Sequence, residues 1–493
     1  MSTTELDFDS CYRAVAARDA RFDGRFYTAV TTTRIYCRPV CPARTPTSRN
    51  VRFYRHAASA EAAGFRPCKR CRPELSPGDP GWDHRGDLVG RALRLIDEGA
   101  ADDGGITRLA GRLHITERHL HRLFAAELGV GPLAVVRTKR LLLAKQLLTE
   151  TGLPISDVAF AAGFGSVRQF NATMKETYGF TPGELRATAG RAASGNALTL
   201  RLHRREPYEA GALMRFLAAR AIPGLERADE TSYSRAVPQG TITLTPFPDH
   251  VRLDVTLDDT RHLARVVARA RRLLDLDADP AAISGALGAT ALAPLVAARP
   301  GLRVPGAWDG FEAAVRAVIG QQISVAGART ILGRLTARAG RTAGGEISGA
   351  IGTAGGGAGE VNGTGANGTH AGGPNLLFPT AADLAEADLA GLGLTGRRVT
   401  TLRALAAKVA GGEIDLDGAQ EPAEAVARLL EVPGIGPWTA GYIALRALRD
   451  PDAWPRGDLG LRRAMVSLGI PEDHIERWRP WRAYAALHLW SSE

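Results

Sequence analysis

Two close pairs of cysteines restrict the fold of this chain more than any other feature. The sequence has 493 residues and five cysteines, and four of these form the pairs Cys37–Cys41 and Cys68–Cys71. This spacing, in turn-rich segments flanked by proline, is typical of a tetrahedral Zn²⁺ site with four thiolate ligands. We therefore predict that one zinc ion holds together a small domain with a modest core. A purely structural site is the usual use of four cysteines, and Cys11 is expected to be a spare thiol.

The cysteine pairs lie in the most basic part of the chain. Residues 25–72 contain 11 Lys and Arg residues against one acidic residue, Glu61, within a chain of formal net charge +10. Aromatic side chains are interleaved with this charge, which favours a surface that contacts phosphates over a merely solvated basic face. We therefore expect double-stranded DNA as a partner.

The N-terminal residues and the length of the apolar stretches indicate where in the cell the protein is located. Residues 1–7 are polar and acidic, without the positive start and apolar run of a signal peptide. No stretch of the sequence is long and apolar enough to cross a bilayer. The absence of both predicts a cytoplasmic protein without a membrane partner, in a compartment where thiols stay reduced.

A helical segment after the cysteines contains two similar units. Residues 106–110 and 155–159 each read as a short helix, and residues 116–124 and 164–170 each read as a second helix after a tight turn. This is helix-turn-helix geometry, in which the later helix faces the major groove, although an ordinary helical bundle is the alternative. The exposed candidates for contacts with bases or phosphates are Arg118, Arg122, Arg168 and Gln169.

The second half of the chain changes pattern twice. Residues 198–202, 240–245 and 251–255 alternate between apolar and polar side chains like strands, with helical segments between and after them. From about residue 304 the pattern is helical again, interrupted by a Gly/Ala/Thr/Asn-rich run over residues 339–374. That run cannot build a core, so we expect a disordered surface insertion.

These patterns predict a multidomain fold that is mainly α with α+β parts. A chain of this length is expected to divide into three or four domains. The expected units are a small zinc-bound domain, a paired helix-turn-helix domain, an α+β subdomain and an all-α domain. Their boundaries are 1–78, 85–190, 197–303 and 304–493.

The segments around the cysteines closely resemble the N-terminal domain of Ada-type adaptive-response proteins. The resemblance rests on residues 26–41, 50–54 and 63–71 and covers essentially the first domain. It implies that Cys37 irreversibly accepts a methyl group from a methylated DNA phosphate, and that Cys37, Cys41, Cys68 and Cys71 all bind zinc. Loss of one thiolate charge would weaken repulsion between the site and DNA. The candidate phosphate contacts are Arg34, Arg38, Arg44, Arg66, Lys69 and Arg70.

The paired helical units resemble the DNA-binding domain of AraC-type transcription regulators. The resemblance rests on residues 155–164 and 178–186, with Thr181-Pro182 near the end of the second unit. It implies binding to promoter sequences, and it makes RNA polymerase a further candidate partner.

Residues 430–440 form a helix-hairpin-helix pattern in which Gly434 and Gly436 would expose N–H groups to a DNA phosphate. A Gly/Pro loop over residues 454–458 follows, and it ends in an aspartate. Together these segments resemble AlkA-type 3-methyladenine DNA glycosylases over nearly all of residues 197–493. The resemblance implies that Asp458 is the catalytic carboxylate.

The same resemblance implies further site residues. Trp438, Tyr442 and Trp490 match an aromatic pocket for a flipped base. Trp438 stands where strand-cleaving relatives carry a lysine, which implies simple hydrolysis without strand cleavage. The residue that fills the gap left by the flipped base aligns with Gln322, a polar side chain where the family's comparison enzyme has an apolar one.

The resemblances together imply a DNA alkylation-repair enzyme that also regulates transcription. It would hydrolytically excise alkylated purines such as 3-methyladenine, while methyl transfer to Cys37 would activate sequence-specific DNA binding. The alternative is a DNA-binding regulator with a catalytically silent glycosylase-like half. The sequence has no Pro-Cys-His-Arg motif and no cysteine after Cys71, so direct repair of alkylated guanine oxygen is not expected.

Overall fold

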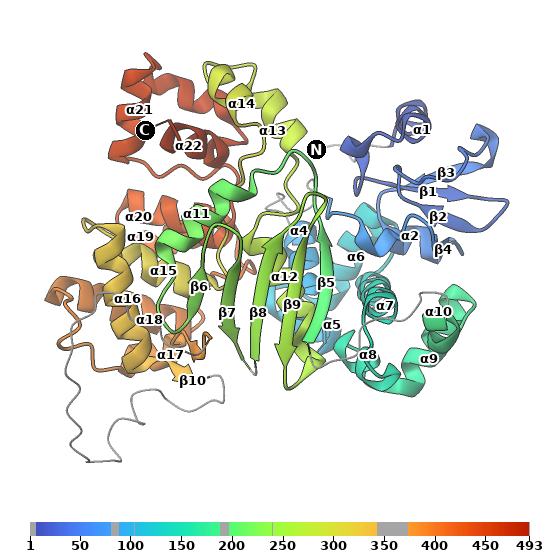
Figure 1. The fold of residues 1–493 in the computed structure, drawn as a ribbon, viewed down its shortest axis with the longest axis horizontal. Helices are drawn as coiled ribbons and strands as arrows, with labels where there is room; N and C mark the ends of the chain where they lie inside the picture. The colour runs from blue at the N-terminus through green and yellow to red at the C-terminus, as the bar shows by residue number, and fades with distance from the viewer. Residues whose placement is uncertain are drawn as a thin grey trace.

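The computed structural model describes residues 6–79, 88–102, 104–187, 197–238, 240–342 and 373–492. Figure 1 shows the N-terminal module at one side of a central sheet and the C-terminal helices at the other side. The paired helical units lie beside the N-terminal module and reach behind the sheet. Among the described residues, no helix combines the length and apolar character needed to span a membrane.

The N-terminal module is a small sheet with two helices packed around it. The strand order is β3-β1-β2-β4, and β2 and β4 are parallel while the other neighbours are antiparallel. Its core contains Ala29, Tyr36, Ala57, Ala60 and Phe65, so it is modest in size, as predicted. The elements are α1 (Phe8–Ala17), η1 (Ala20–Phe22), β1 (Tyr27–Val30), β2 (Ile35–Cys37), η2 (Ser48–Asn50), β3 (Val51–Tyr54), α2 (Ala57–Ala62), β4 (Arg66–Pro67) and η3 (Pro73–Leu75).

The paired helix-turn-helix arrangement predicted from the sequence is present. The second helix of each unit starts at a hydroxyl cap, Thr116 or Ser166, and ends at a left-handed glycine, Gly129 or Gly179. A long central helix joins the two units. The elements are α4 (Leu88–Asp97), α5 (Gly105–Arg112), α6 (Glu117–Leu128), α7 (Pro132–Glu150), α8 (Ile155–Ala161), α9 (Val167–Tyr178) and α10 (Pro182–Ala187).

The central sheet is antiparallel, with the order β5-β9-β8-β7-β6. The sequence predicted three of these strands and missed β6 and β7. Strand β6 has three residues, and β7 buries the charged Arg235, which breaks the expected alternation. The elements are β5 (Ala197–His203), α11 (Ala210–Arg220), β6 (Glu226–Ala228), β7 (Tyr233–Val237), β8 (Gly240–Pro246), β9 (His250–Leu257), η4 (Thr260–His262), α12 (Leu263–Leu273), α13 (Pro280–Leu287) and α14 (Ala293–Ala298).

The C-terminal part is helical apart from one short ladder. Strands β10 and β11 pair Arg341 with Leu377 and Thr342 with Leu376, so the prediction of an all-α domain missed two strands. The elements are α15 (Gly310–Ile319), α16 (Val325–Ala339), β10 (Arg341–Thr342), β11 (Leu376–Leu377), α17 (Ala381–Glu386), α18 (Gly396–Ala410), α19 (Pro422–Leu430), α20 (Pro437–Ile443), η6 (Ala444–Leu448), α21 (Leu459–Ser467), η7 (Glu472–Trp478) and α22 (Arg482–Trp490).

The glycine-rich insertion starts later than predicted. Ala339 is the last residue of α16, and residues 341–342 belong to β10, although both lie within the predicted insertion of residues 339–374. Residues 343–372 lie outside the described residues. The ladder of β10 and β11 closes the base of this insertion.

Hydrophobic cores run across the expected domain limits. Leu141 to Leu185, in the second helical unit, share one cluster with Leu198 to Leu276 of the sheet and its helix α12. Helices α13 and α14 share another cluster with α21 and α22, on the other side of the expected boundary at residue 303. The parts of the chain therefore pack as one body, with two sites at its opposite sides.

Candidate metal centre and candidate base pocket

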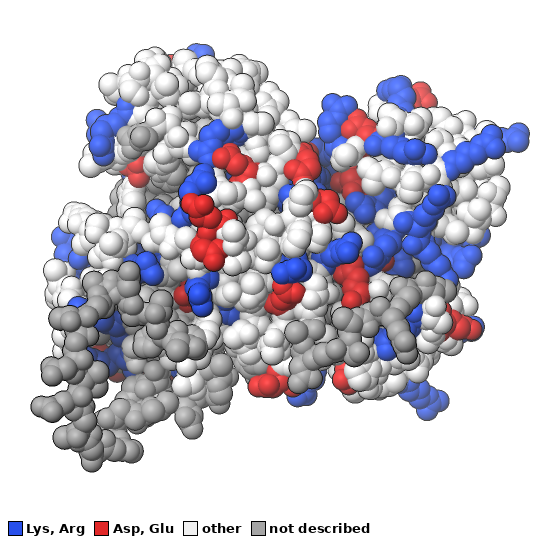
Figure 2. All heavy atoms as spheres, viewed as in Figure 1, with Lys and Arg blue, Asp and Glu red and all other residues white. Residues whose placement is uncertain are grey.

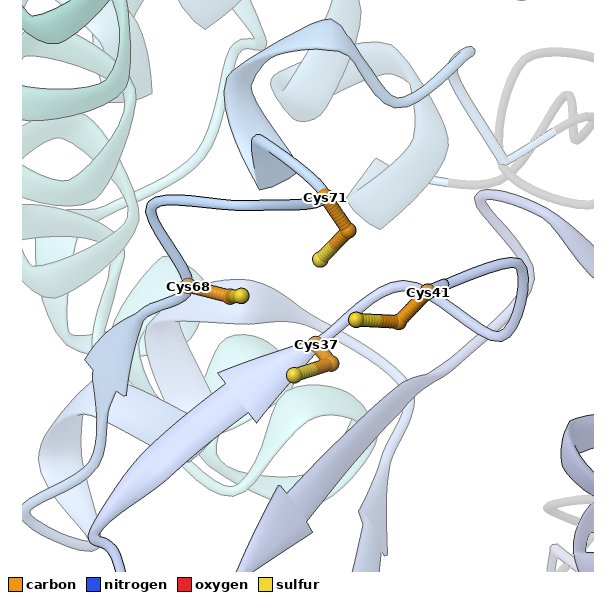
Figure 3. Close-up of side chains that lie close together, drawn as sticks. All are labelled: Cys37, Cys41, Cys68 and Cys71. Atoms are coloured by element: carbon orange, nitrogen blue, oxygen red, sulfur yellow. The ribbon is translucent and has the colours of Figure 1, made fainter. Parts of the chain in front are cut away.

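The four paired cysteines converge at one point of the N-terminal module. Figure 3 shows the side chains of Cys37, Cys41, Cys68 and Cys71 pointing toward one another. Their sulfur atoms all lie within 4.8 Å of each other. Zinc–sulfur bonds of about 2.3 Å in a tetrahedron require sulfur atoms about 3.8 Å apart, so this cluster fits one zinc ion.

Strand pairing explains why the cysteines meet. Strands β2 and β4 are parallel, with Tyr36 opposite Pro67, so Cys37 and Cys68 follow at the same end of the sheet. Two tight turns supply the second cysteine of each pair. The backbone N–H of Arg38 donates to Cys71 Sγ, and the backbone N–H of Arg70 donates to Cys68 Sγ, each over 3.3 Å. These donors favour sulfur that carries negative charge.

Exposure separates the four ligands into two classes. Cys68 and Cys71 are buried, while Cys37 and Cys41 are half-buried. A reaction partner would therefore reach the site from the side of Cys37 and Cys41.

The basic residues around the cysteines do not share one role. The side chains of Arg34, Arg44, Arg66, Lys69 and Arg70 are exposed, and Figure 2 shows Lys and Arg gathered over this module. In contrast, Arg38 is half-buried and pairs through Nε with Asp23 Oδ1 at 2.9 Å. Its Nη1 donates to the Cys71 carbonyl. The prediction that Arg38 contacts phosphate is not supported, because its guanidinium is already engaged inside the module.

The later helix of each helix-turn-helix unit presents the predicted polar residues to solvent. Arg118 and Arg122 are exposed and one turn apart on α6, and Arg168 and Gln169 are exposed in the first turn of α9. Arg122 Nη2 lies 3.0 Å from Nδ1 of His119, which steadies its position. The structure thus leaves all four predicted side chains accessible to DNA.

The predicted hairpin lies between α19 and α20, and its two glycines have different reasons to be there. Gly434 has φ of +90°, and a Cβ atom would lie 2.1 Å from Thr401 Oγ1, so another residue would not fit. Gly436 has an ordinary φ of −96° and open space around it. The turn therefore requires Gly434, while Gly436, the N-cap of α20, leaves the first N–H groups of that helix without a side-chain cap.

Asp458 stands at the start of α21 with both carboxylate oxygens engaged. Oδ2 accepts from the Trp438 indole N–H at 2.7 Å, and Oδ1 accepts from the Trp490 indole N–H at 3.0 Å. As the N-cap, Asp458 Oδ1 also accepts from the backbone N–H of Leu461 at 2.9 Å. Three donors fix the direction of this carboxylate.

The predicted aromatic side chains gather around this carboxylate. Trp438 stacks on Tyr442 with ring centres 5.5 Å apart, and Tyr442 meets Trp490 edge-on at 6.3 Å. Together with Asp458 they line a cavity of about 560 Å³ between α11, α15, α20 and α22. The cavity has the size and apolar, aromatic lining expected of a small-ligand site.

Matches to known domains cover three parts of the chain, among them the part that holds the four cysteines. The metal binding domain of Ada matches residues 10–74, a helix-turn-helix domain matches residues 109–188, and the AlkA N-terminal domain matches residues 199–309. The probable bifunctional transcriptional activator/DNA repair enzyme AlkA of Mycobacterium tuberculosis is 46% identical over 502 residues, covering 99% of this chain and 96% of the relative. This chain belongs to the family of Ada/AlkA fusion proteins.

Two further relatives of this Ada/AlkA fusion each match one half of it. DNA-3-methyladenine glycosylase 2 of Escherichia coli is 32% identical over 297 residues, covering 58% of this chain and 95% of the relative. The bifunctional transcriptional activator/DNA repair enzyme Ada of Escherichia coli is 37% identical over 183 residues, covering 37% of this chain and 50% of the relative. The fusion is therefore a DNA-repair protein with a regulator half, and its four cysteines form a site for a single zinc ion.

Two arginines that line the cavity of this fusion protein were not predicted from the sequence. Arg220, the last residue of α11, and Arg446, in η6, both line the cavity beside Tyr442. Burial raises the pKa of Tyr442, but the two guanidinium groups outweigh burial and hold that pKa below its usual value. The spacing of Arg446 four residues after Tyr442 was the available signal, because such pairs share one face of a helix.

Close packing beneath the cavity also escaped the sequence analysis. A Cβ atom at Gly441 would lie 2.6 Å from the Trp454 carbonyl oxygen, so only glycine lets α20 approach the loop that carries Asp458. Gln321, next to the predicted Gln322, donates through Nε2 to Gly434 O and Thr439 Oγ1 at 3.1 and 2.8 Å. Gln322 itself is exposed in a turn with φ of +56°.

Proposed function

We propose that the C-terminal half hydrolytically excises alkylated purines such as 3-methyladenine from DNA, with Asp458 as the catalytic carboxylate. The observation that carries the proposal is the pair of indole donors, Trp438 and Trp490, that hold both oxygens of Asp458 inside an aromatic cavity. A damaged base must leave the helical stack to be cut, and the cavity is large enough for one flipped nucleobase. Gln322, at the exposed turn beside the cavity, is the proposed residue that fills the vacated stack.

The chemistry follows from a fixed negative charge beside aromatic rings. As the bond between the base and the sugar breaks, positive charge develops on the sugar, and the Asp458 carboxylate stabilises it. The same carboxylate can take a proton from the attacking water. Cationic purines stack favourably on Trp438 and Tyr442, with about 0.5–2 kcal/mol expected for each contact. No lysine occupies the position of Trp438, so we expect hydrolysis without strand cleavage.

For the N-terminal half we propose irreversible methyl transfer to Cys37. Bound zinc keeps its four sulfur ligands deprotonated and therefore nucleophilic. Cys37 Sγ would attack the methyl carbon of a DNA methylphosphotriester, the carbon–oxygen bond would break, and the phosphodiester anion would leave. The half-buried position of Cys37 supports access from DNA, and the exposed Arg34, Arg44, Arg66, Lys69 and Arg70 are proposed to hold the flanking phosphates.

We propose that this modification switches on promoter binding. The four-cysteine site loses one negative charge when Cys37 becomes a thioether, so its repulsion of DNA falls. Helices α6 and α9 would then read the promoter through Arg118, Arg122, Arg168 and Gln169, with RNA polymerase as a further proposed partner. The domain limits 1–78, 85–190, 197–303 and 304–493 and a cytoplasmic location remain proposals of the same kind.

Release of free base from alkylated DNA tests the enzymatic proposal. The full-length protein is expected to release 3-methyladenine from dimethyl sulfate-treated DNA, and D458N is expected to lower the single-turnover rate at least about 100-fold. Both proteins should bind an abasic-site duplex with similar affinity. No release by the wild-type protein would leave the alternative, a DNA-binding regulator with a silent glycosylase-like half.

Mass spectrometry tests the methyl-acceptor proposal. After incubation with DNA containing methylphosphotriesters, the zinc-loaded protein should gain one methyl group, located on Cys37. A peptide map without this mass would make the zinc site purely structural.

A further inference from the structure

The cavity of the proposed glycosylase has two ends of opposite charge. Asp458 and the two tryptophans form one end, while Arg220, Arg446 and the hydroxyl of Tyr442 form the other. Glu226 and Glu312 also line the cavity, but each is paired with Arg316 at 2.6 Å, and Arg235 completes this buried network. The network of two carboxylates and two guanidiniums balances itself, so it does not neutralise Arg220 or Arg446.

Neither of the two arginines at the Tyr442 end is balanced by an acid. Within the described part of the chain, no carboxylate lies within ion-pair distance of Arg220 or Arg446. Both guanidinium groups are half-buried and cover Phe216, with Cζ atoms 3.8 and 4.6 Å from its ring centre. An unpaired, partly buried charge in a cavity is costly to fold and points to a ligand.

The two arginines differ in how many donors they have left. Arg446 donates through Nε to Pro305 O at 2.6 Å, through Nη2 to Gly306 O at 3.0 Å and through Nη1 to the Tyr442 hydroxyl at 3.0 Å. Arg220 has one long backbone contact, from Nη1 to Phe216 O at 3.4 Å, and an interaction with the Tyr442 hydroxyl. Since a guanidinium has five N–H donors, Arg220 keeps most of its donors for a ligand.

The position of Arg220 is fixed by its surroundings. Its guanidinium carbon lies 3.8 Å from the centre of the Phe216 ring, and its carbonyl oxygen accepts from Arg316 Nη1 at 3.1 Å. The end of α11 is thus tied to α15 through the balanced network. A donor held in this way can discriminate between bases that differ in one acceptor atom.

We infer that Arg220 is a specificity-determining residue that donates hydrogen bonds to a carbonyl oxygen on the flipped purine. This inference rests on the proposed glycosylase function. A purine with a ring carbonyl, such as 7-methylguanine, gains a charge-assisted hydrogen bond at this end of the cavity. 3-Methyladenine carries an amino group at the corresponding position and has no oxygen to accept it. Both bases are cationic while attached to DNA, so the difference between them is the acceptor and not the charge.

One substrate tests the inference, because dimethyl sulfate-treated DNA contains both lesions. The rates of release of 7-methylguanine and 3-methyladenine are measured by chromatography in the same single-turnover reaction, for the wild-type protein and for R220M. The ratio of the 7-methylguanine rate to the 3-methyladenine rate is expected to fall about 10- to 100-fold in R220M, the loss typical of one hydrogen bond to a charged group. R220K, which keeps one charged donor, should restore part of the ratio.

The matched control is R215M, which removes an exposed arginine of the same helix and should leave the ratio unchanged. A misfolded R220M would lower both rates equally, so R220M must first show the circular dichroism spectrum and melting temperature of the wild-type protein. In a folded R220M, an unchanged ratio overturns the inference, and where R220M does not fold, an unchanged ratio in a folded R220K overturns it. Equal losses together with weaker binding of R220M to an abasic-site duplex would also overturn it, and would make Arg220 a phosphate contact. Release of neither base by the wild-type protein would overturn the proposed function instead.

Discussion

At the scale of single residues, two arginines that are each adjacent to a zinc ligand in the sequence differ in burial. Arg38 follows Cys37 and Arg70 precedes Cys71, and both are arginines in a basic segment. Arg38 is 12% exposed and pairs with Asp23, which is 8% exposed, whereas Arg70 is exposed. A buried pair is a structural interaction, whereas an exposed arginine beside the proposed methyl acceptor is accessible to phosphate.

This contrast predicts separable effects of R38Q and R70Q. R38Q leaves the Asp23 carboxylate buried without its partner, so we expect a loss of about 3 kcal/mol in the free energy of unfolding of the zinc-loaded module. R70Q should leave the free energy of unfolding unchanged. It should weaken the dependence of DNA affinity on salt concentration by the amount expected for about one phosphate contact. Urea unfolding and binding at several salt concentrations measure the two effects. Equal stability losses in both variants would contradict the assignment.

At the scale of elements, one side chain joins three parts of the glycosylase half. Gln321 follows α15, donates to the hairpin at Gly434 and donates to Thr439 on α20, the helix that carries Trp438 and Tyr442. Arg398 of α18 donates to the Gln321 carbonyl oxygen. The turn that presents Gln322 is therefore held against the proposed phosphate-binding hairpin.

Substitution of the two adjacent glutamines should separate positioning from direct contact. Q321M keeps the side-chain volume but leaves the Gly434 carbonyl and the Thr439 hydroxyl without this donor, so we expect a stability loss of about 1–3 kcal/mol together with slower excision. Q322A, at an exposed position, should slow excision without a comparable loss of stability. Urea unfolding and single-turnover excision test both variants, and a stable, fully active Q321M would refute the role given to Gln321.

The helix that carries Trp490 contains a buried histidine that should make stability depend on pH. Burial, together with the nearby Arg299 and against the opposing effect of Glu209, lowers the pKa of His488 to about 4. The unfolded chain, with a histidine pKa of about 6.5, binds more protons than the folded chain between these values. Stability contributed by neutral His488 is therefore present above pH of about 6.5 and is lost as pH falls toward 4.

The variant H488Q, which does not titrate, should remove this contribution. Its free energy of unfolding is expected to fall less steeply than that of the wild-type protein between pH 6.5 and 4, by up to about 1.4 kcal/mol per pH unit. Denaturant unfolding at a series of pH values gives both slopes. Parallel curves for the two proteins would show that His488 does not titrate in this range.

At the scale of the whole molecule, the zinc module and the helix-turn-helix domain share buried polar contacts. Lys145 of α7 is buried, and its Nζ donates to the Cys68 carbonyl oxygen at 3.1 Å and to Glu74 at 2.6 Å. Glu61 of α2 accepts from Tyr178 of α9 and from Thr138 of α7. The backbone of the zinc ligand Cys68 is thus hydrogen-bonded directly to α7, the helix that joins the two helix-turn-helix units.

A double-mutant cycle at this contact tests whether the domains unfold as one. K145M removes one of the two cationic partners of the buried Glu74 carboxylate and leaves Arg72 Nε at 3.1 Å as the other, so we expect a loss of about 1–3 kcal/mol, and K145M/E74Q should recover part of it. Zinc removal by a chelator should lower the melting temperature of the helical domain in the wild-type protein more than in K145M, as followed by calorimetry. A helical domain whose melting does not respond to zinc in either protein would rule out this coupling.

The sequence by itself determined which local motifs exist. The four cysteines, the doubled helical units and the loop that ends in Asp458 are short-range patterns, because metal ligation, helix capping and tight turns need particular residues at fixed spacing. Tertiary structure decided what depends on distant partners: Arg38 is buried because Asp23 faces it, and Arg220 lines the cavity because α11 packs against α16. The same long-range packing joins hydrophobic cores across the expected domain limits. The periodicity of apolar residues along the chain cannot predict such packing.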